Sequence, residues 1–177
     1  MLSAADHRSA LAADAVVVSA VGERCPCGEG RAYEACCARY HAGAEPPDAE
    51  TLVRSRYSAF VRGEHAYLYR TLHVDHEDHA GGAAAFGVQL ARAAKRTRYE
   101  GLRVLDREGP DFDGVARVLF HVAMRFEWRD SSFVELSSFV HDGEGWRYVG
   151  GTTRRVSADH AAPLRIASFS AETPRGA

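Results

Sequence analysis

The sequence predicts an α+β fold, because helical periodicity fills the first half of the chain and alternating periodicity fills most of the second. All four cysteines precede both halves, within residues 25–37. The chain has 177 residues, of which 46% are hydrophobic, and this suffices for one core of ordinary size with a small appendage. The expected regions are an N-terminal extension (1–22), a metal-binding knuckle (23–41), an α+β domain (48–156) and a C-terminal tail (157–177).

Charge and targeting signals argue against two classes of partner. The formal charge of −2 and the isoelectric point near 6.5 give no basic field over the whole chain, so nucleic acid is not an expected partner. Asp6 and Asp14 interrupt the alanine- and valine-rich N-terminus where a secretion signal needs positive charge and an unbroken apolar run. No stretch approaches the roughly 20 apolar residues of a membrane span. We therefore expect a cytoplasmic protein that makes no membrane contact.

The four cysteines have the number and spacing that suit one structural zinc ion. Four thiolates complete a tetrahedral zinc site and leave no ligand position for a catalytic water. Pro26 restricts the backbone between the first two cysteines, and Gly28 and Gly30 can adopt positive φ where the chain bends around an ion. A reducing compartment would keep the thiols free for the metal. The expected ligands are Cys25, Cys27, Cys36 and Cys37.

Two other uses of these thiols are weighed against the metal site. Four cysteines allow three disulfide pairings. A bridge between the neighbours Cys36 and Cys37 is strained, however, and the other pairings would close very short loops. A redox pair would be favoured by a Cys-x-x-Cys sequence in a thioredoxin-like setting, and neither is found here. A structural metal site is the preferred interpretation.

Helical periodicity begins at Asp48, which is placed to act as an N-cap. Apolar residues then recur at Val53, Tyr57 and Phe60, which is the spacing of one helical face. Gly63 interrupts this pattern before it resumes. The sequence therefore predicts helices over 48–62, 64–73 and 83–95.

Alternating periodicity replaces the helical pattern in the second half of the chain. The clearest strand covers residues 118–128, where apolar and polar side chains alternate to give one buried face. The tail from residue 157 has no sustained period, so we expect it to wrap the surface or to be disordered. The predicted strands are one around Leu102 and Val104, followed by 118–128, 133–141 and 146–149.

The order Cys-Pro-Cys-Gly-x-Gly-x-x-Tyr-x-x-Cys-Cys at residues 25–37 resembles the SEC-C motif, a zinc knuckle found at the C-terminus of SecA and in other bacterial proteins. Residues 23–153 further resemble the YchJ family. The resemblance implies a nuclear transport factor 2-like middle domain, in which a curved antiparallel sheet wraps around helices to form a cone. The matching segments are 52–60, 71–73, 101–104, 135–139 and 145–152.

The resemblance makes a zinc-binding adaptor protein the leading functional hypothesis. In SecA the similar knuckle contacts an acidic chaperone partner and ribosomes, which implies a protein partner at the knuckle, in translocation or at the ribosome. The exposed faces of such sheets often pair, so a homodimer is also expected. Many relatives carry a second SEC-C motif, but no cysteine follows Cys37 here.

A small-molecule binding protein or an enzyme is the alternative hypothesis, because conical folds often hold a pocket between sheet and helices. Glu135 is the candidate acid or base of such a pocket, since its neighbours on the same strand face include aromatic residues. The preferred interpretation of Glu135 itself is a structural ion pair with Arg54 or Arg56. The candidate pocket residues are Tyr57, His73, Glu135, Trp146 and Tyr148.

Three histidines suggest a second metal site. His73, His76 and His79 are interspersed with three acidic residues, and a helix would place them on a slowly drifting face. The segment follows a predicted helix end and precedes two glycines, so a solvated loop is the preferred interpretation.

Overall fold

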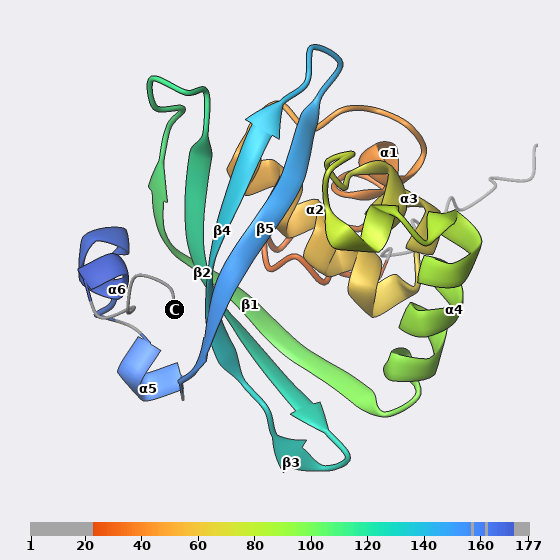
Figure 1. Ribbon diagram of the computed structural model, residues 1–177. Helices are drawn as coiled ribbons and strands as arrows, with labels where there is room; N and C mark the ends of the chain where they lie inside the picture. The colour runs from red at the N-terminus through yellow and green to blue at the C-terminus, as the bar shows by residue number, and fades with distance from the viewer. Residues whose placement is uncertain (1–22, 157, 162, 172–177) are drawn as a thin grey trace, which may run out of the picture.

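A computed structural model of the chain describes residues 23–156, 158–161 and 163–171. In this part of the chain a layer of helices lies on the concave face of one twisted antiparallel sheet, and two short C-terminal helices lie on the other face (Figure 1). The extension predicted for residues 1–22 lies outside the described residues. The helices and the sheet together form the predicted cone.

The helical layer is made of α1 (Ala38–His41), α2 (Ala49–Arg62), α3 (His65–Arg70), the 3-10 turn η1 (Glu77–His79) and α4 (Gly82–Ala94). Asp48 caps α2, because its side chain accepts a hydrogen bond from the Thr51 N–H at 2.7 Å. Gly63, with a φ of 75°, ends α2 in the left-handed conformation that glycine adopts without strain. None of the helices in the described residues has the length and apolar character needed to cross a membrane.

The sheet consists of β1 (Thr97–Glu108), β2 (Ala116–Phe126), β3 (Arg129–Asp130), β4 (Phe133–His141) and β5 (Trp146–Arg155). Its main path runs β1-β2-β4-β5 with antiparallel neighbours, and β3 pairs with the end of β2. Val118, Phe120 and Val122 pack against the helical layer, whereas Leu119 belongs to a second core on the convex face. Alternate side chains of β2 are therefore buried on opposite faces of the sheet. The strand predicted over 133–141 agrees with β4 at both ends.

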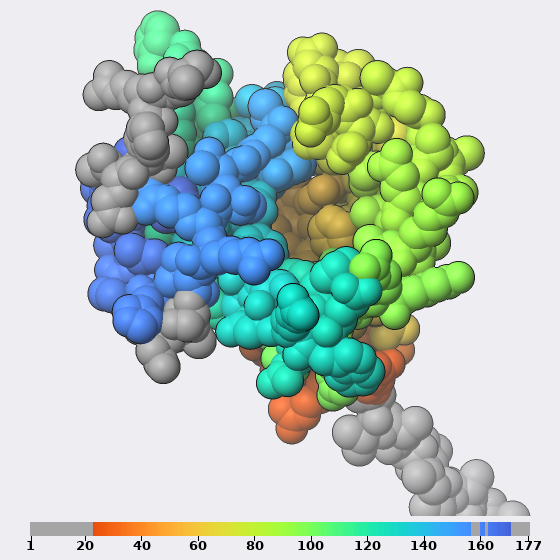
Figure 2. Space-filling model, turned by 60° about the horizontal axis from the view of Figure 1, so that its bottom comes forward, coloured from red at the N-terminus to blue at the C-terminus, as the bar shows by residue number. Residues whose placement is uncertain are grey.

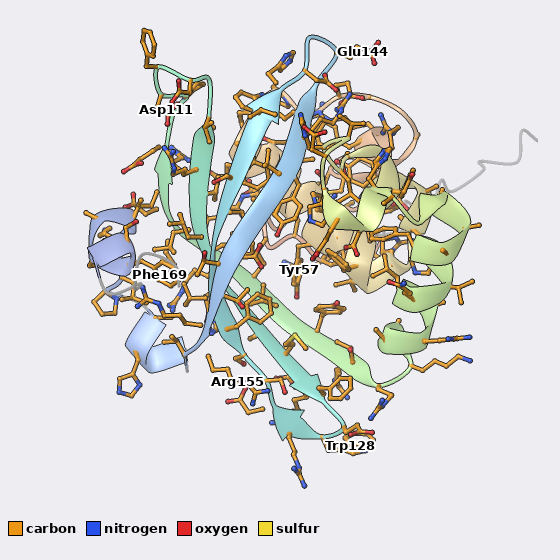
Figure 3. All side chains as sticks on the ribbon, in the orientation of Figure 1. Tyr57, Asp111, Trp128, Glu144, Arg155 and Phe169 are labelled. Carbon is orange, nitrogen blue, oxygen red and sulfur yellow. The ribbon has the colours of Figure 1, made fainter. Side chains whose placement is uncertain are left out.

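The predicted strand over 118–128 is wrong at its C-terminal end. β2 stops at Phe126, and Glu127 and Trp128 turn the chain with φ values of 48° and 69°. Trp128 is 83% exposed and stands at the tip of the β2–β3 hairpin, away from the core (Figure 3). The prediction included Trp128 only because its side chain is apolar. In the structure β2 ends earlier, because the chain reverses tightly into β3.

The C-terminal tail forms regular structure that the sequence analysis did not predict. α5 (Ala158–Ala161) and α6 (Ile166–Ala171) lie on the convex face, where Phe169 is fully buried (Figures 1 and 3). Leu119 and Val134 of the sheet form the other half of this second core. The described part of the tail is thus ordered and packs a small core against the sheet, which the lack of a sustained period did not predict.

Backbone pairing joins the residues that follow α3 to β5. The Tyr148 N–H donates to the Thr71 carbonyl at 2.9 Å, and the His73 N–H donates to the Tyr148 carbonyl at 2.8 Å. Glu45, in the connection before α2, pairs with Arg70 at 2.6 Å and with Arg147 at 3.0 Å. These contacts hold the helices at a fixed place over the concave face.

Candidate functional site

The four cysteine sulfurs form one compact cluster. All four side chains are buried, and their Sγ atoms lie within 4.8 Å of one another. None of them forms a disulfide, and the Sγ atoms of Cys27 and Cys36 are 3.5 Å apart. Gly28 and Gly30 adopt φ values of 86° and 75°, as the tight bend around the cluster requires. This donor set fits one metal ion, because four thiolates supply a complete tetrahedral shell.

The thiols already share their protons in a way that suits a metal ligand set. Hydrogen bonding from Cys37 lowers the pKa of Cys27 to about 5, although burial acts against it. The same bond raises the pKa of Cys37, and burial raises that of Cys36 to about 11. The Cys27 sulfur is thus favoured as a thiolate, and Cys36 and Cys37 are favoured as thiols beside it. Direct bonds from a cation to the four sulfurs would replace this network.

The knuckle is packed directly against α2. The Sγ of Cys25 lies 3.7 Å from the Ser58 hydroxyl. The Arg54 guanidinium donates to the Cys27 carbonyl at 3.2 Å. His41 bridges the Tyr33 hydroxyl and the Ser55 carbonyl, at 2.8 and 2.9 Å. The cysteine cluster is therefore part of the body of the protein rather than a separate lobe.

A cavity of about 380 Å³ opens on the other side of α2, inside the cone. Figure 2 shows this hollow between the sheet and the green helix α4, with α2 visible behind it. We call it the cone pocket. Its walls are mainly aromatic and aliphatic, and they include Tyr57, Phe60, Phe86, Leu90, Tyr99, Phe120 and Phe133.

Polar side chains gather at one end of the cone pocket. The Glu135 Oε1 atom accepts hydrogen bonds from the Ser137 hydroxyl at 2.5 Å and the Tyr148 hydroxyl at 3.0 Å. Burial, followed by the charge of Glu135, raises the pKa of Tyr148, so this hydroxyl remains a donor at neutral pH. Arg56, 7% exposed, lies with its guanidinium 4.9 Å from the centre of the Tyr148 ring.

The ion pair predicted for Glu135 is wrong. Arg54 points to the other side of α2, where it pairs with Glu29 at 3.0 Å and Glu50 at 2.8 Å. Arg56 faces the cone pocket, but one of its terminal nitrogens donates to the Leu68 carbonyl at 2.8 Å and the Thr71 hydroxyl at 2.6 Å. One nitrogen of the guanidinium is thus held by α3 and by Thr71, which follows it, and the carboxylate takes neutral donors instead.

The structure brings together three of the five predicted pocket residues. Tyr57, Glu135 and Tyr148 line the cone pocket. His73 lies outside it, where Nδ1 accepts from the Asp75 N–H at 3.3 Å. Trp146 also lies outside, since its indole N–H donates to the Pro47 carbonyl at 3.3 Å. Arg56 was not predicted as a lining residue, although its place on the Tyr57 side of the helix could have suggested it.

The histidine segment does not gather into a metal site in the described residues, where the cysteine cluster is the one such group. His76 lines the rim of the cone pocket together with Glu77 and Asp78, which are exposed. His79 stacks on Tyr69, with ring centres 4.7 Å apart. The preferred interpretation as a loop is therefore correct for most of the segment, with one 3-10 turn inside it.

Comparison with known proteins places this geometry in a family. Residues 48–151 match the family model described as YchJ, middle NTF2-like domain. The chain belongs to the YchJ family. A UPF0225 protein from Bordetella pertussis is 40% identical over 133 residues, which cover 73% of this chain and 92% of that protein.

Two solved structures share the fold of this YchJ family member. One is the solution structure of a SEC-C motif containing protein from Rhodopseudomonas palustris, with a TM-score of 0.62, 23% identity and coverage of 75% of this chain and 100% of that one. The other is the crystal structure of a SEC-C motif containing protein from Psychrobacter arcticus, with a TM-score of 0.58, 24% identity and coverage of 77% and 85%. The fold is therefore shared with proteins that are less than 25% identical to this chain.

Proposed function

We propose that the protein binds a small organic molecule in the cone pocket. The observation that carries the proposal is the cavity of about 380 Å³, which has apolar walls and a hydrogen-bonded polar group at one end. Small-molecule sites are concave and mostly apolar, with a few placed polar groups that orient the ligand. Glu135 is the group positioned to exchange a proton with a bound molecule. If the protein is an enzyme, Glu135 is therefore its candidate acid or base.

We further propose that the cysteine cluster holds Zn²⁺ in a structural role, in the reducing cytoplasm. The four thiolates leave no coordination position for substrate. The contacts of the knuckle with Ser58 and Ser55 support this role, because an ion held by the four cysteines would lie behind the helix that forms one wall of the cone pocket. Structural zinc sites contribute roughly 10–16 kcal/mol of apparent binding energy, enough to order a segment that has almost no core of its own.

Blocking the cone pocket tests the proposed function. Leu90 lines the pocket from α4, whereas Val88, on the same helix, is 52% exposed and lies outside it. N-Phenyl-1-naphthylamine, a neutral dye that fluoresces in apolar sites, should bind the wild type and Val88→Trp equally and Leu90→Trp at least about tenfold more weakly. Equal binding of the dye by the two variants would contradict the proposal. Failure of the wild type to bind the dye would contradict it as well.

Protein recognition at the knuckle is the second candidate function. A polar groove of about 290 Å³ separates the cysteine cluster from the start of α2. Arg31, Arg39 and Arg54 line it together with Glu29 and Glu50. Charged, concave surfaces of this kind favour specific partners and raise association rates.

Charge reversal in the groove tests the second candidate. Arg31 and Arg92 are both exposed, but only Arg31 lines the groove. Proteins that are crosslinked to the wild type in the native cytoplasm should be recovered with Arg92→Glu and lost with Arg31→Glu. Recovery of the same proteins with both variants would reject recognition through the groove.

A further inference from the structure

We propose that the ligand of the cone pocket is an organic cation, namely an ammonium group on an apolar body, and that the ammonium group binds to Glu135. This inference rests on the proposed function, because it names the chemical class of ligand for the same pocket. It also assigns Gly151 as the residue that leaves space for the carboxylate at this position.

Glu135 has an acceptor oxygen left over for a ligand. Both hydrogen bonds that it receives from described residues, from Ser137 and Tyr148, end on Oε1. A carboxylate offers about four lone-pair positions on its two oxygens, so the Oε2 atom keeps its accepting capacity. The residue lines the cone pocket, and an ammonium group carries three donors and no acceptor. The free oxygen is therefore matched by a cationic donor.

The charges around the cone pocket favour a cation. Its lining includes three carboxylates, on Glu77, Asp78 and Glu135, against the single guanidinium of Arg56. That guanidinium is engaged by the Leu68 carbonyl and the Thr71 hydroxyl. The lining therefore has an excess of two negative charges, and these belong to Glu77 and Asp78 at the exposed rim, where they attract a cation toward the pocket but are screened by solvent.

The aromatic walls favour the same class of ligand. The Tyr57 and Tyr99 rings meet edge to face at 5.8 Å, and Phe60 lies 6.2 Å from Tyr99. Aromatic faces attract cations through their quadrupole and also bury an apolar body. An anion would meet the negative faces of these rings as well as the carboxylates, so it is disfavoured.

Gly151 provides the space in which the Glu135 side chain lies. A Cβ atom at position 151 would be 2.5 Å from the Glu135 Oε1 atom and 3.0 Å from its Cγ and Cδ atoms. A Cβ atom at the neighbouring Gly150 would have no such neighbour within 4 Å. Neither glycine has a positive φ, so alanine fits the backbone at both positions. Gly151 is therefore a positioning residue for the carboxylate, and Gly150 is a matched control.

Three naphthalene probes that differ in one group test the ligand class. We expect 1-naphthylmethylamine to bind the wild type at least about tenfold more tightly than 1-naphthalenemethanol at pH 7, which is the effect of one hydrogen bond to a charged group. 1-Naphthoate should bind more weakly than the alcohol. Isothermal titration calorimetry on the full chain gives the three dissociation constants.

Variants assign the selectivity to particular residues. Glu135→Gln keeps an acceptor for Ser137 and Tyr148, and it should reduce the preference for the amine over the alcohol to about twofold or less. Gly151→Ala should reduce this preference in the same direction while Gly150→Ala leaves it unchanged. Binding of the neutral naphthylamine dye should persist in all three variants and reports that the cone is folded.

The outcomes separate this inference from the proposed function. Equal binding of amine and alcohol, or tightest binding of the naphthoate, would overturn the cation inference while the cone pocket still binds small molecules. If Gly151→Ala and Gly150→Ala have the same effect on the preference for the amine, the positioning role of Gly151 is overturned while the cone pocket still binds small molecules. Failure of all three probes and of the dye to bind would remove both the inference and the proposed function.

Discussion

The cysteine cluster and the cone pocket lie on opposite sides of α2 and are built in opposite ways. Every cysteine of the cluster comes from residues 25–37, whereas the pocket takes side chains from α2, α4 and most of the sheet. The cluster depends on a short local sequence, and the pocket depends on the whole fold. A single substitution should therefore remove the first site entirely, while the second should change in affinity or selectivity.

Loss of one cysteine tests the local half of this comparison with the largest expected effect. Cys36→Ser should abolish stoichiometric zinc binding and lower the free energy of unfolding by about 4 kcal/mol or more, the linkage expected for an ion at a thousandfold its dissociation constant. Urea unfolding with metal analysis measures both quantities. Ala35→Ser, at an exposed neighbouring position, should change neither. Retention of zinc by Cys36→Ser would contradict the four-cysteine site.

Substitution of two arginines of α2 tests whether the pocket side of the helix contributes more to stability than the knuckle side. Arg56→Met removes hydrogen bonds to the Leu68 carbonyl and Thr71 hydroxyl from a buried site, so we expect a loss of about 3 kcal/mol of unfolding free energy. Arg54→Met removes partly exposed ion pairs and the hydrogen bond to the Cys27 carbonyl, and it should cost less, about 2 kcal/mol at most. Denaturant unfolding of both variants gives the difference, and equal losses would show that the two sides are not distinct.

Lowering the pH should reduce the stability of the fold through His121, which belongs to neither site, and this effect should be smaller than the two above. Burial, then the charge of Arg103, lowers the pKa of His121 on the convex face, while a bond to the Val156 backbone and the charge of Asp130 act in the other direction. The folded state thus takes up this proton less readily than the unfolded chain. The stability is fully present above the ordinary histidine pKa of about 6.5 and is lost as the pH falls below it, by at most about 1.4 kcal/mol per pH unit.

His121→Leu isolates that effect. Unfolding free energies measured between about pH 7 and pH 5, on either side of the ordinary histidine pKa, should fall less steeply in this variant than in the wild type. The remaining slope then belongs to other groups, including the cysteine cluster, because thiols that bind a metal must lose their protons. An unchanged slope would mean that His121 contributes nothing to acid sensitivity.

Local patterns in the sequence predicted the local features of the structure. The Asp48 cap, the limits of β4 and the gathering of the four cysteines depend on residues close in the chain, so spacing and residue type were sufficient. The end of β2 was missed because Trp128 has the right polarity for a strand, and only the pairing of β3 shows that the chain has already turned.

Features set by tertiary structure were predicted less well. Alternation assigns Trp146 and Tyr148 to one face of β5, but it does not say how far along the cone each lies, and only Tyr148 reaches the pocket. Arg56 was assigned to an ion pair because its nearer partners, on α3, come from a helix whose position the sequence does not specify. The two C-terminal helices are short, and their burial arises from the convex face that they cover.

The position of α2 between the two sites has a consequence for binding equilibria. Val53, Arg56 and Tyr57 face the cone pocket, while Ser55 and Ser58 contact the knuckle. Thermodynamic linkage is reciprocal, so any factor by which the metal raises affinity for a ligand in the cone is the factor by which that ligand raises affinity for the metal. If the cluster holds the proposed zinc and the metal favours ligand binding, scarcity of zinc in the cell would weaken binding of the proposed ligand, and an abundant ligand would strengthen retention of the metal.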